Sequence, residues 1–137
     1  MAGITRHEDL RAWQLSDLLE DRIYAFLDRP GPRVDRDYCA DIRRSARSAP
    51  ANLSEGFYRF RPRDNAKFVR YALGSLGESM NHLRHAFKRG YISEDEYTDM
   101  SSLAKRAFGA ATKWHQYLMK CPPDGPRPVN REPEPEP

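Results

Sequence analysis

The stretch SEDEYTDMSSLAKRAFGAATKWHQYLMK, residues 93–120, decides the fold class. It opens with Ser93 and Glu96 at capping-box spacing, where each side chain can bind an amide that the first helical turn leaves unpaired. The stretch therefore predicts a helix that ends at Cys121-Pro122-Pro123, because proline cannot continue it. Apolar residues recur along it in alternating steps of three and four, as in packed helices: Tyr97, Met100, Ala104, Ala107, Ala111, Trp114 and Leu118.

The same periodicity predicts three more helices upstream. The first runs from Thr5, which has capping-box spacing to Glu8, to about Asp28. The second begins between residues 34 and 37, after Pro30-Gly31-Pro32. The third is capped by Asp64 or Asn65, after Arg61-Pro62-Arg63, and stops at Gly90.

The apolar stripes of these helices predict which side chains form the core. The stripe of the first helix is Ala12, Leu15, Leu19, Ile23 and Phe26. That of the second is Cys39, Ile42, Ala46, Ala49, Leu53, Gly56 and Phe60. That of the third is Val69, Leu73, Leu76, Met80, Leu83 and Phe87.

Four such helices joined by short loops pack as antiparallel neighbours. No segment shows a convincing period of two, which a half-buried strand requires. The sequence therefore predicts an all-α fold, an antiparallel up-and-down four-helix bundle over residues 1–121. Residues 122–137 are rich in proline and glutamate and poor in apolar residues, so we expect a disordered C-terminal tail.

Composition limits the function classes. The chain has 137 residues, a formal net charge of +3 and a pI near 9.0, a mildly basic balance that permits nucleic acid as a partner without requiring it. It shows no signal-peptide pattern and no apolar run of the roughly 18–20 residues that cross a bilayer, so we expect a cytoplasmic protein that does not enter the membrane. Cys39 and Cys121 lack metal-site spacing, and no cofactor or metal is predicted.

Basic residues fall into two clusters along the chain. The first, around the first half of the second helix, is Arg33, Arg36, Arg43, Arg44 and Arg47, of which the last three are the candidate binding residues. The second surrounds the break before the third helix, with Tyr58 and Phe60 interleaved: Arg59, Arg61, Arg63, Lys67 and Arg70. The planar fork of arginine suits phosphate, and aromatic rings can stack on bases, so both clusters predict a nucleic-acid surface. The alternative is a solvated basic face that acids such as Asp35, Asp37 and Asp41 partly neutralise.

Four polar residues are expected to meet where the second and third helices adjoin: Asn52, Glu55, Ser75 and Glu78. They predict a hydrogen-bond network that fixes the register of the two helices. Acid–base work by the paired carboxylates is the alternative. His82 and His85 lack the paired Glu-x-x-His motif of di-iron bundles, and no nucleophile is recognisable, so we expect no enzyme and no catalytic residue.

Several pieces of the sequence, in order along the chain, form a recognisable set. They are HEDL at residues 7–10 with Trp13-Gln14, IRRSARSAPANLSEG at 42–56, FVRYALGSLGE at 68–78, and Gly90-Tyr91-Ile92. The set resembles the bacterial four-helix-bundle family encoded in intervening sequences of 23S rRNA genes, and the resemblance covers about residues 7–119. It is also similar to the accessory variability determinant of diversity-generating retroelements.

This resemblance implies a four-helix bundle assembled as a homopentamer, in a family with no established enzymatic activity. The likeness to the accessory determinant implies nucleic acid and a reverse transcriptase as partners. Our hypothesis is a non-enzymatic oligomer that binds nucleic acid through its arginine-rich surface, as an accessory to an RNA- or DNA-acting partner. The alternative is a structural or adaptor oligomer that binds protein, for which the wide apolar face of the first helix is suited: Trp13, Leu18, Tyr24 and Leu27.

Overall fold

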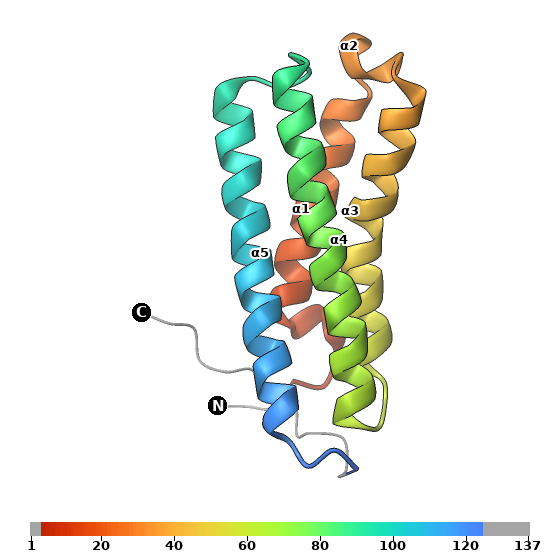
Figure 1. The fold of residues 1–137 in the computed structure, drawn as a ribbon, viewed down its shortest axis with the longest axis vertical. Coiled ribbons are helices and arrows are strands. Elements are labelled where there is room, and N and C mark those ends of the chain that lie inside the picture. The colour runs from red at the N-terminus through yellow and green to blue at the C-terminus, as the bar shows by residue number, and fades with distance from the viewer. Residues whose placement is uncertain (1–3, 125–137) are drawn as a thin grey trace.

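The computed structural model describes residues 4–124, which form helices and connections without any β-strand. Four long helices make an up-and-down bundle (Figure 1): α1 (Arg11–Leu27), α3 (Arg36–Phe57), α4 (Pro62–Lys88) and α5 (Glu94–Lys120). Two short helices, η1 (His7–Asp9) and α2 (Pro30–Arg33), flank α1. Both α3 and α5 pack against α1 and α4, so α1 and α4 lie diagonally opposite. The predicted all-α bundle is confirmed; the predicted tail lies outside the described residues from residue 125 onward.

The helix α5 forms as its sequence predicts. The Ser93 hydroxyl accepts a hydrogen bond from the Glu96 amide at 3.1 Å, and the Glu96 carboxylate accepts one from the Ser93 amide at 3.0 Å. Six of the seven predicted stripe residues are buried, and Tyr97 is half-buried. Because its stripe and its cap are both local features, this helix is the most completely predicted element.

The connection between α3 and α4 differs from the prediction. The helix α4 begins at Pro62, whose fixed φ suits the first turn and whose missing N–H costs no bond there. Asn65, predicted as a cap, is instead buried inside the first turns of α4. Phe60 was predicted to close the stripe of α3, but that helix ends at Phe57. Phe57 is fully buried and Phe60 is 65% exposed.

The beginning of α1 also differs from the prediction. The helix starts at Arg11, and the Thr5–Glu8 capping box does not form. The carboxylate of Glu8 instead lies 3.1 Å from Nδ1 of His7, and its carbonyl accepts a hydrogen bond from the side chain of Gln14. Fully buried Leu10 joins η1 to α1 and anchors this segment on the core.

Small side chains let α3 and α4 approach each other closely. A Cβ placed on Gly56 would lie 2.8 Å from Cβ of Phe68 on α4, closer than real Cβ contacts allow. Further along the same seam, the buried hydroxyls of Ser45 and Ser79 lie 3.0 Å apart and share a hydrogen bond. This seam brings the end of α3 against the start of α4, where the second basic cluster lies.

The long helices are amphipathic, each with one buried stripe and a largely polar outer surface. None of the helices within residues 4–124 combines the length and the hydropathy that a bilayer crossing requires.

Candidate nucleic-acid interface

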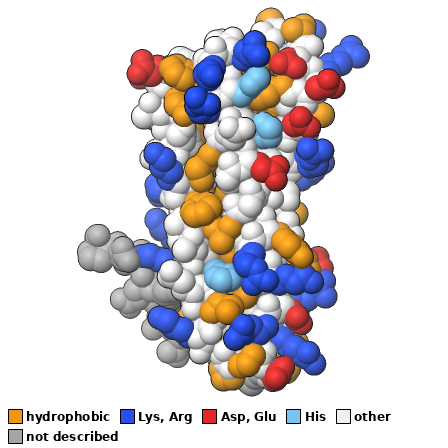
Figure 2. Space-filling view, viewed as in Figure 1, with side chains coloured by type: hydrophobic (Ala, Val, Ile, Leu, Met, Phe, Trp, Pro, Cys, Tyr) orange, Lys and Arg blue, Asp and Glu red, His pale blue; other side chains and the backbone are white. Residues whose placement is uncertain are grey.

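Two aromatic side chains reach solvent at the α3–α4 corner, between cations. Tyr58 follows the last residue of α3 and is 53% exposed, and Phe60 lies in the connection to α4. Figure 2 shows Lys and Arg side chains gathered at the lower end of the molecule, over this corner, with hydrophobic side chains between them. The rings are therefore accessible for stacking on a flat partner.

Arg59 differs from its neighbours because its charge is compensated. Its guanidinium forms an ion pair with Glu55 one helical turn earlier. The same group lies over the ring of Phe68, with the carbon of the guanidinium 4.9 Å from the ring centroid. Arg59 therefore closes the α3–α4 seam and contributes little free charge to the corner.

Four further cations of the predicted cluster are uncompensated. Within residues 4–124, no carboxylate lies at ion-pair distance from them: Arg61, Arg63, Lys67 and Arg70. Arg70 extends the positive charge toward α5. The pKa of His115 on α5 is lowered, chiefly because burial disfavours the charged imidazole and also because Arg70 repels it. We call these four cations together with Tyr58 and Phe60 the corner surface.

Two members of the first basic cluster, Arg43 and Arg44, are paired with acids, and the cluster does not join the corner surface. Arg43 lies 3.8 Å from the carboxylate of Asp28, and Arg44 lies 3.2 Å from that of Asp41. Arg47 faces Glu20 on α1; burial raises the pKa of Glu20, and the charge of Arg47 opposes that rise. The side chains of Arg43 and Arg47 thus face α1. The structure therefore does not gather the eight predicted binding residues into one surface.

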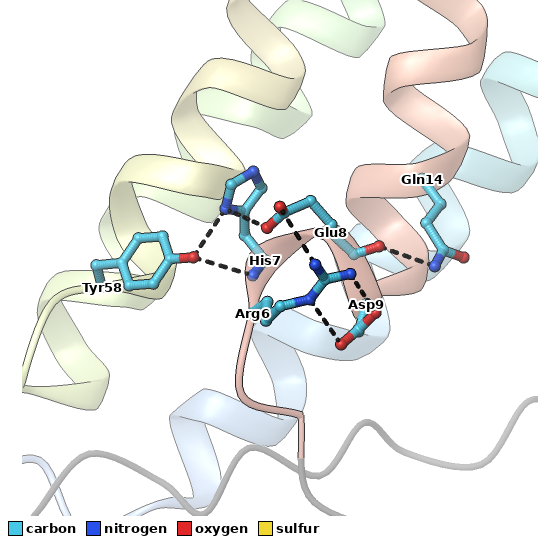
Figure 3. A network of polar contacts seen from close by, with 6 residues as sticks. All are labelled: Arg6, His7, Glu8, Asp9, Gln14 and Tyr58. Carbon is cyan, nitrogen blue, oxygen red and sulfur yellow. Dashed lines mark hydrogen bonds and ion pairs between the residues drawn. The ribbon is translucent and has the colours of Figure 1, made fainter.

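The N-terminal segment is held against the corner by contacts that the sequence analysis missed (Figure 3). The Tyr58 hydroxyl accepts a hydrogen bond from the His7 amide at 3.3 Å and lies 2.9 Å from Nδ1 of the same residue. The His7 ring packs edge-on against Trp13, with centroids 5.0 Å apart. These partners are 51 residues apart in sequence, so no local pattern could have predicted the contact.

The predicted polar quartet requires correction. Asn52 donates to the Ser48 hydroxyl at 2.9 Å, and Ser75 donates to the same hydroxyl at 2.8 Å, so Ser48 links two of the four residues across α3 and α4. Glu55 is exposed and paired with Arg59, and Glu78 is exposed. The two carboxylates therefore lie outside the linked group, because each is on the exposed side of its own helix.

The histidines of α4 pack around Tyr38 rather than around a metal-binding cluster. The Tyr38 hydroxyl donates to the carbonyl of His82 at 2.6 Å, and its ring stacks on His85 with centroids 4.8 Å apart. Burial lowers the pKa of His82, while Asp41 and Glu78 partly oppose that shift. Residues 4–124 hold no group of three or more His, Cys, Asp or Glu side chains placed to bind a metal ion.

A basic hollow that was not predicted from the sequence lies at the other end of α4. Its lining residues are Asn81, Arg84, His85, Lys88 and Arg89. The spacing of three and four between residues 81, 84, 85 and 88 is the signal that could have found it, since such residues share one helix face.

Comparison with known proteins identifies the family. A family model described as 23S rRNA-intervening sequence protein matches residues 8–110. This match spans all of α1, α3 and α4 and most of α5. A comparison with curated proteins finds no match. Since the family model covers well over half of the 137 residues, the chain belongs to the 23S rRNA-intervening sequence protein family.

Proposed function

We propose that the chain binds nucleic acid electrostatically through the corner surface, without reading base sequence. One observation carries this proposal: Arg61, Arg63, Lys67 and Arg70 have no carboxylate at ion-pair distance within residues 4–124 and follow two exposed aromatic rings, Tyr58 and Phe60, along the chain. Cations that neutralise phosphates release condensed counterions, which supplies binding free energy independent of sequence. Exposed Tyr58 and Phe60 add stacking, which every base accepts.

The proposal includes self-association, with the homopentamer that the family resemblance implies as the expected assembly. Exposed apolar side chains on α4 and α5 support it: Phe87, Phe108 and Met119 are each between 37% and 39% exposed. Hydrophobic side chains run in a broken column down this face (Figure 2). Assembly would repeat the corner surface, so several weak phosphate contacts could act together. A reverse transcriptase is the partner that the likeness to the accessory variability determinant suggests.

The test is a fluorescence-anisotropy titration of labelled duplex DNA, single-stranded DNA and structured RNA at several salt concentrations. The variant R61A/R63A removes two uncompensated charges, and R43A/R44A removes two charges that acids already neutralise. Each lost phosphate contact should lower the slope of log affinity against log salt by about 0.9 on duplex DNA. We expect R61A/R63A to flatten the slope and R43A/R44A to leave it nearly unchanged. Equal slopes for both variants would show that the corner surface is not the phosphate-binding surface.

The second candidate function is a non-enzymatic adaptor that binds a protein. The apolar face of α4 and α5 favours it. On α1, Leu27 is fully buried and Trp13 and Tyr24 pack against the core, so that of the four predicted residues only Leu18 is exposed, at 41%. A pull-down in which a protein partner remains bound after nuclease treatment, together with no nucleic-acid binding at low salt, would select this candidate. In both candidates the chain acts by binding and needs no cofactor.

A further inference from the structure

The end of α4 that is remote from the corner surface forms a hollow with a volume of about 300 Å³, at the lower limit of small-ligand pockets. All five side chains that line it can donate hydrogen bonds, and none is a carboxylate. Figure 2 shows Lys and Arg side chains gathered beside a histidine at the upper end of this face. The hollow thus concentrates donors and positive charge at one place.

The charges around the hollow are uncompensated. Among the described residues, Arg84, Lys88 and Arg89 have no carboxylate at ion-pair distance. Asp35, which reaches this end of the bundle, is occupied by other donors: its carboxylate accepts hydrogen bonds from the Tyr91 hydroxyl at 2.8 Å and from the Tyr38 amide at 3.4 Å. The hollow therefore carries a local excess of positive charge.

Helix capping does not account for these cations. Basic side chains near a helix C-terminus commonly offset the dipole or bind the last carbonyls. Here backbone amides bind these last carbonyls instead. The Tyr91 amide donates to the Ala86 carbonyl at 2.8 Å, and the Gly90 amide donates to the Phe87 carbonyl at 3.1 Å. Gly90 has a φ of 75°, the left-handed conformation that this Schellman arrangement requires. The cationic side chains are left free, and their charge exceeds the half charge of the dipole.

One wall of the hollow is held in place before any ligand binds. The ring of Tyr38 stacks on His85 at an interplanar angle of 22°, and the Tyr38 hydroxyl is anchored on the carbonyl of His82. His85 therefore has little freedom to lose on binding, which lowers the entropic cost of recognition. The flexible arginine and lysine side chains can then close over a ligand that rests on this wall.

We propose that this hollow binds a phosphate group. A tetrahedral oxyanion has several acceptor oxygens and needs donors that converge from different sides, whereas a carboxylate would occupy a single guanidinium fork. Inorganic phosphate and the terminal phosphate of a nucleotide chain share this chemistry. The proposal does not rest on the corner surface, because the two sites lie at opposite ends of α4.

The first experiment titrates the isotope-labelled full chain with inorganic phosphate and with pyrophosphate at constant ionic strength, and follows backbone amide and His85 imidazole NMR signals. The variant R84Q/K88Q removes one arginine and one lysine from the hollow. The matched control K105Q/R106Q removes the same two charges from an exposed stretch of α5. We expect the affinity for pyrophosphate to fall about tenfold or more in R84Q/K88Q, as the loss of charge-assisted hydrogen bonds implies, and to stay nearly unchanged in the control.

Several outcomes would overturn the proposal. They are an equal loss in both variants, shifts caused equally by acetate at the same ionic strength, and an absence of shifts at residues 81–89. Far-UV circular dichroism of both variants guards against misfolding, and R84Q and K88Q measured singly provide a second comparison.

A second arm identifies the source of the phosphate and uses the R61A/R63A background, so that the corner surface contributes little. One outcome is that a 5′-phosphorylated oligonucleotide binds more tightly than its 5′-hydroxyl counterpart, and that R84Q/K88Q abolishes this preference. This outcome assigns the hollow to the phosphorylated end of a nucleic acid. Equal binding of the two oligonucleotides by a chain that still binds pyrophosphate assigns it to a free phosphate compound.

Discussion

The guanidinium of Arg29 and the carboxylate of Glu96 are joined by two parallel hydrogen bonds, one from each terminal nitrogen to a separate oxygen. Arg29 lies just after α1, and Glu96 lies in the first turn of α5. The same carboxylate also accepts the amide of Ser93 in the capping box. One side chain therefore starts α5 and ties that start to the end of α1.

Glu96 should make stability depend on pH in the acid range. The hydrogen bonds from Arg29 and then from Ser93 lower the pKa of Glu96 from 4.5 to about 2. A depressed pKa stabilises the fold above pH 4.5, and this contribution is lost as pH falls toward 2. The difference in unfolding free energy between the native chain and E96Q should shrink over that window. The control E94Q replaces an exposed acid in the same turn; a pH-independent E96Q difference would contradict the prediction.

Gly56 should be intolerant of any side chain. Because a Cβ there would lie 2.8 Å from Phe68, G56A should lower the free energy of unfolding by about 1–3 kcal/mol through overpacking. G74A is the matched control, since nothing lies within 4 Å of a Cβ at that helical position. It should stabilise the chain by about 0.5–1 kcal/mol, because alanine favours helix. Denaturant unfolding measures both values, and equal effects would refute the close approach of α3 and α4.

Tyr58 should control the order of the N-terminal segment. The substitution Y58F keeps the ring and removes the hydroxyl that meets His7, at a cost of about 0.5–1.5 kcal/mol. Amide hydrogen exchange at residues 7–10 should accelerate. Y71F serves as control because it removes a hydroxyl from an exposed tyrosine on α4. Unchanged exchange in Y58F would show that other contacts hold the segment.

Phe108 should contribute to self-association if the α4–α5 face is the contact between copies. F108S removes an apolar side chain that is 38% exposed on α5. Its control, V34S, removes one that is 80% exposed away from this face. Sedimentation velocity should show F108S shifted toward smaller species and V34S unchanged. Identical distributions for the native chain and F108S would exclude this face as a major interface.

The elements that the sequence predicts well are those set by neighbouring residues. In α5 the cap and the heptad stripe are both local, so its bounds follow directly, and of its buried residues only Leu103 lies outside the predicted stripe. At the α3–α4 corner two patterns compete: Asn65 has the chemistry of a cap, but Pro62 can open a helix three residues earlier. Phe60 lies outside α3 because the connection, residues 58–61, falls earlier in the chain than the predicted break.

The candidate site was harder to predict because charge compensation depends on tertiary structure. The partners of Arg43 and Arg47, Asp28 and Glu20, belong to or follow α1. Only the rotation of α3 against α1 brings them together. Glu55 likewise turns away from Ser75 because the register of α3 and α4 places Ser48 at their contact. Sequence spacing shows which residues share a helix face but not which face a neighbouring helix covers.

The length of α4 has a geometric consequence for long polyanions. A helix of 27 residues spans about 40 Å. Along duplex DNA, with its rise of 3.4 Å per base pair, that span corresponds to about 12 base pairs. The span of α4 therefore sets a minimum length for a ligand that contacts both ends. A straight duplex shorter than this cannot reach from Arg63 to Lys88 along one subunit, however many charges it carries.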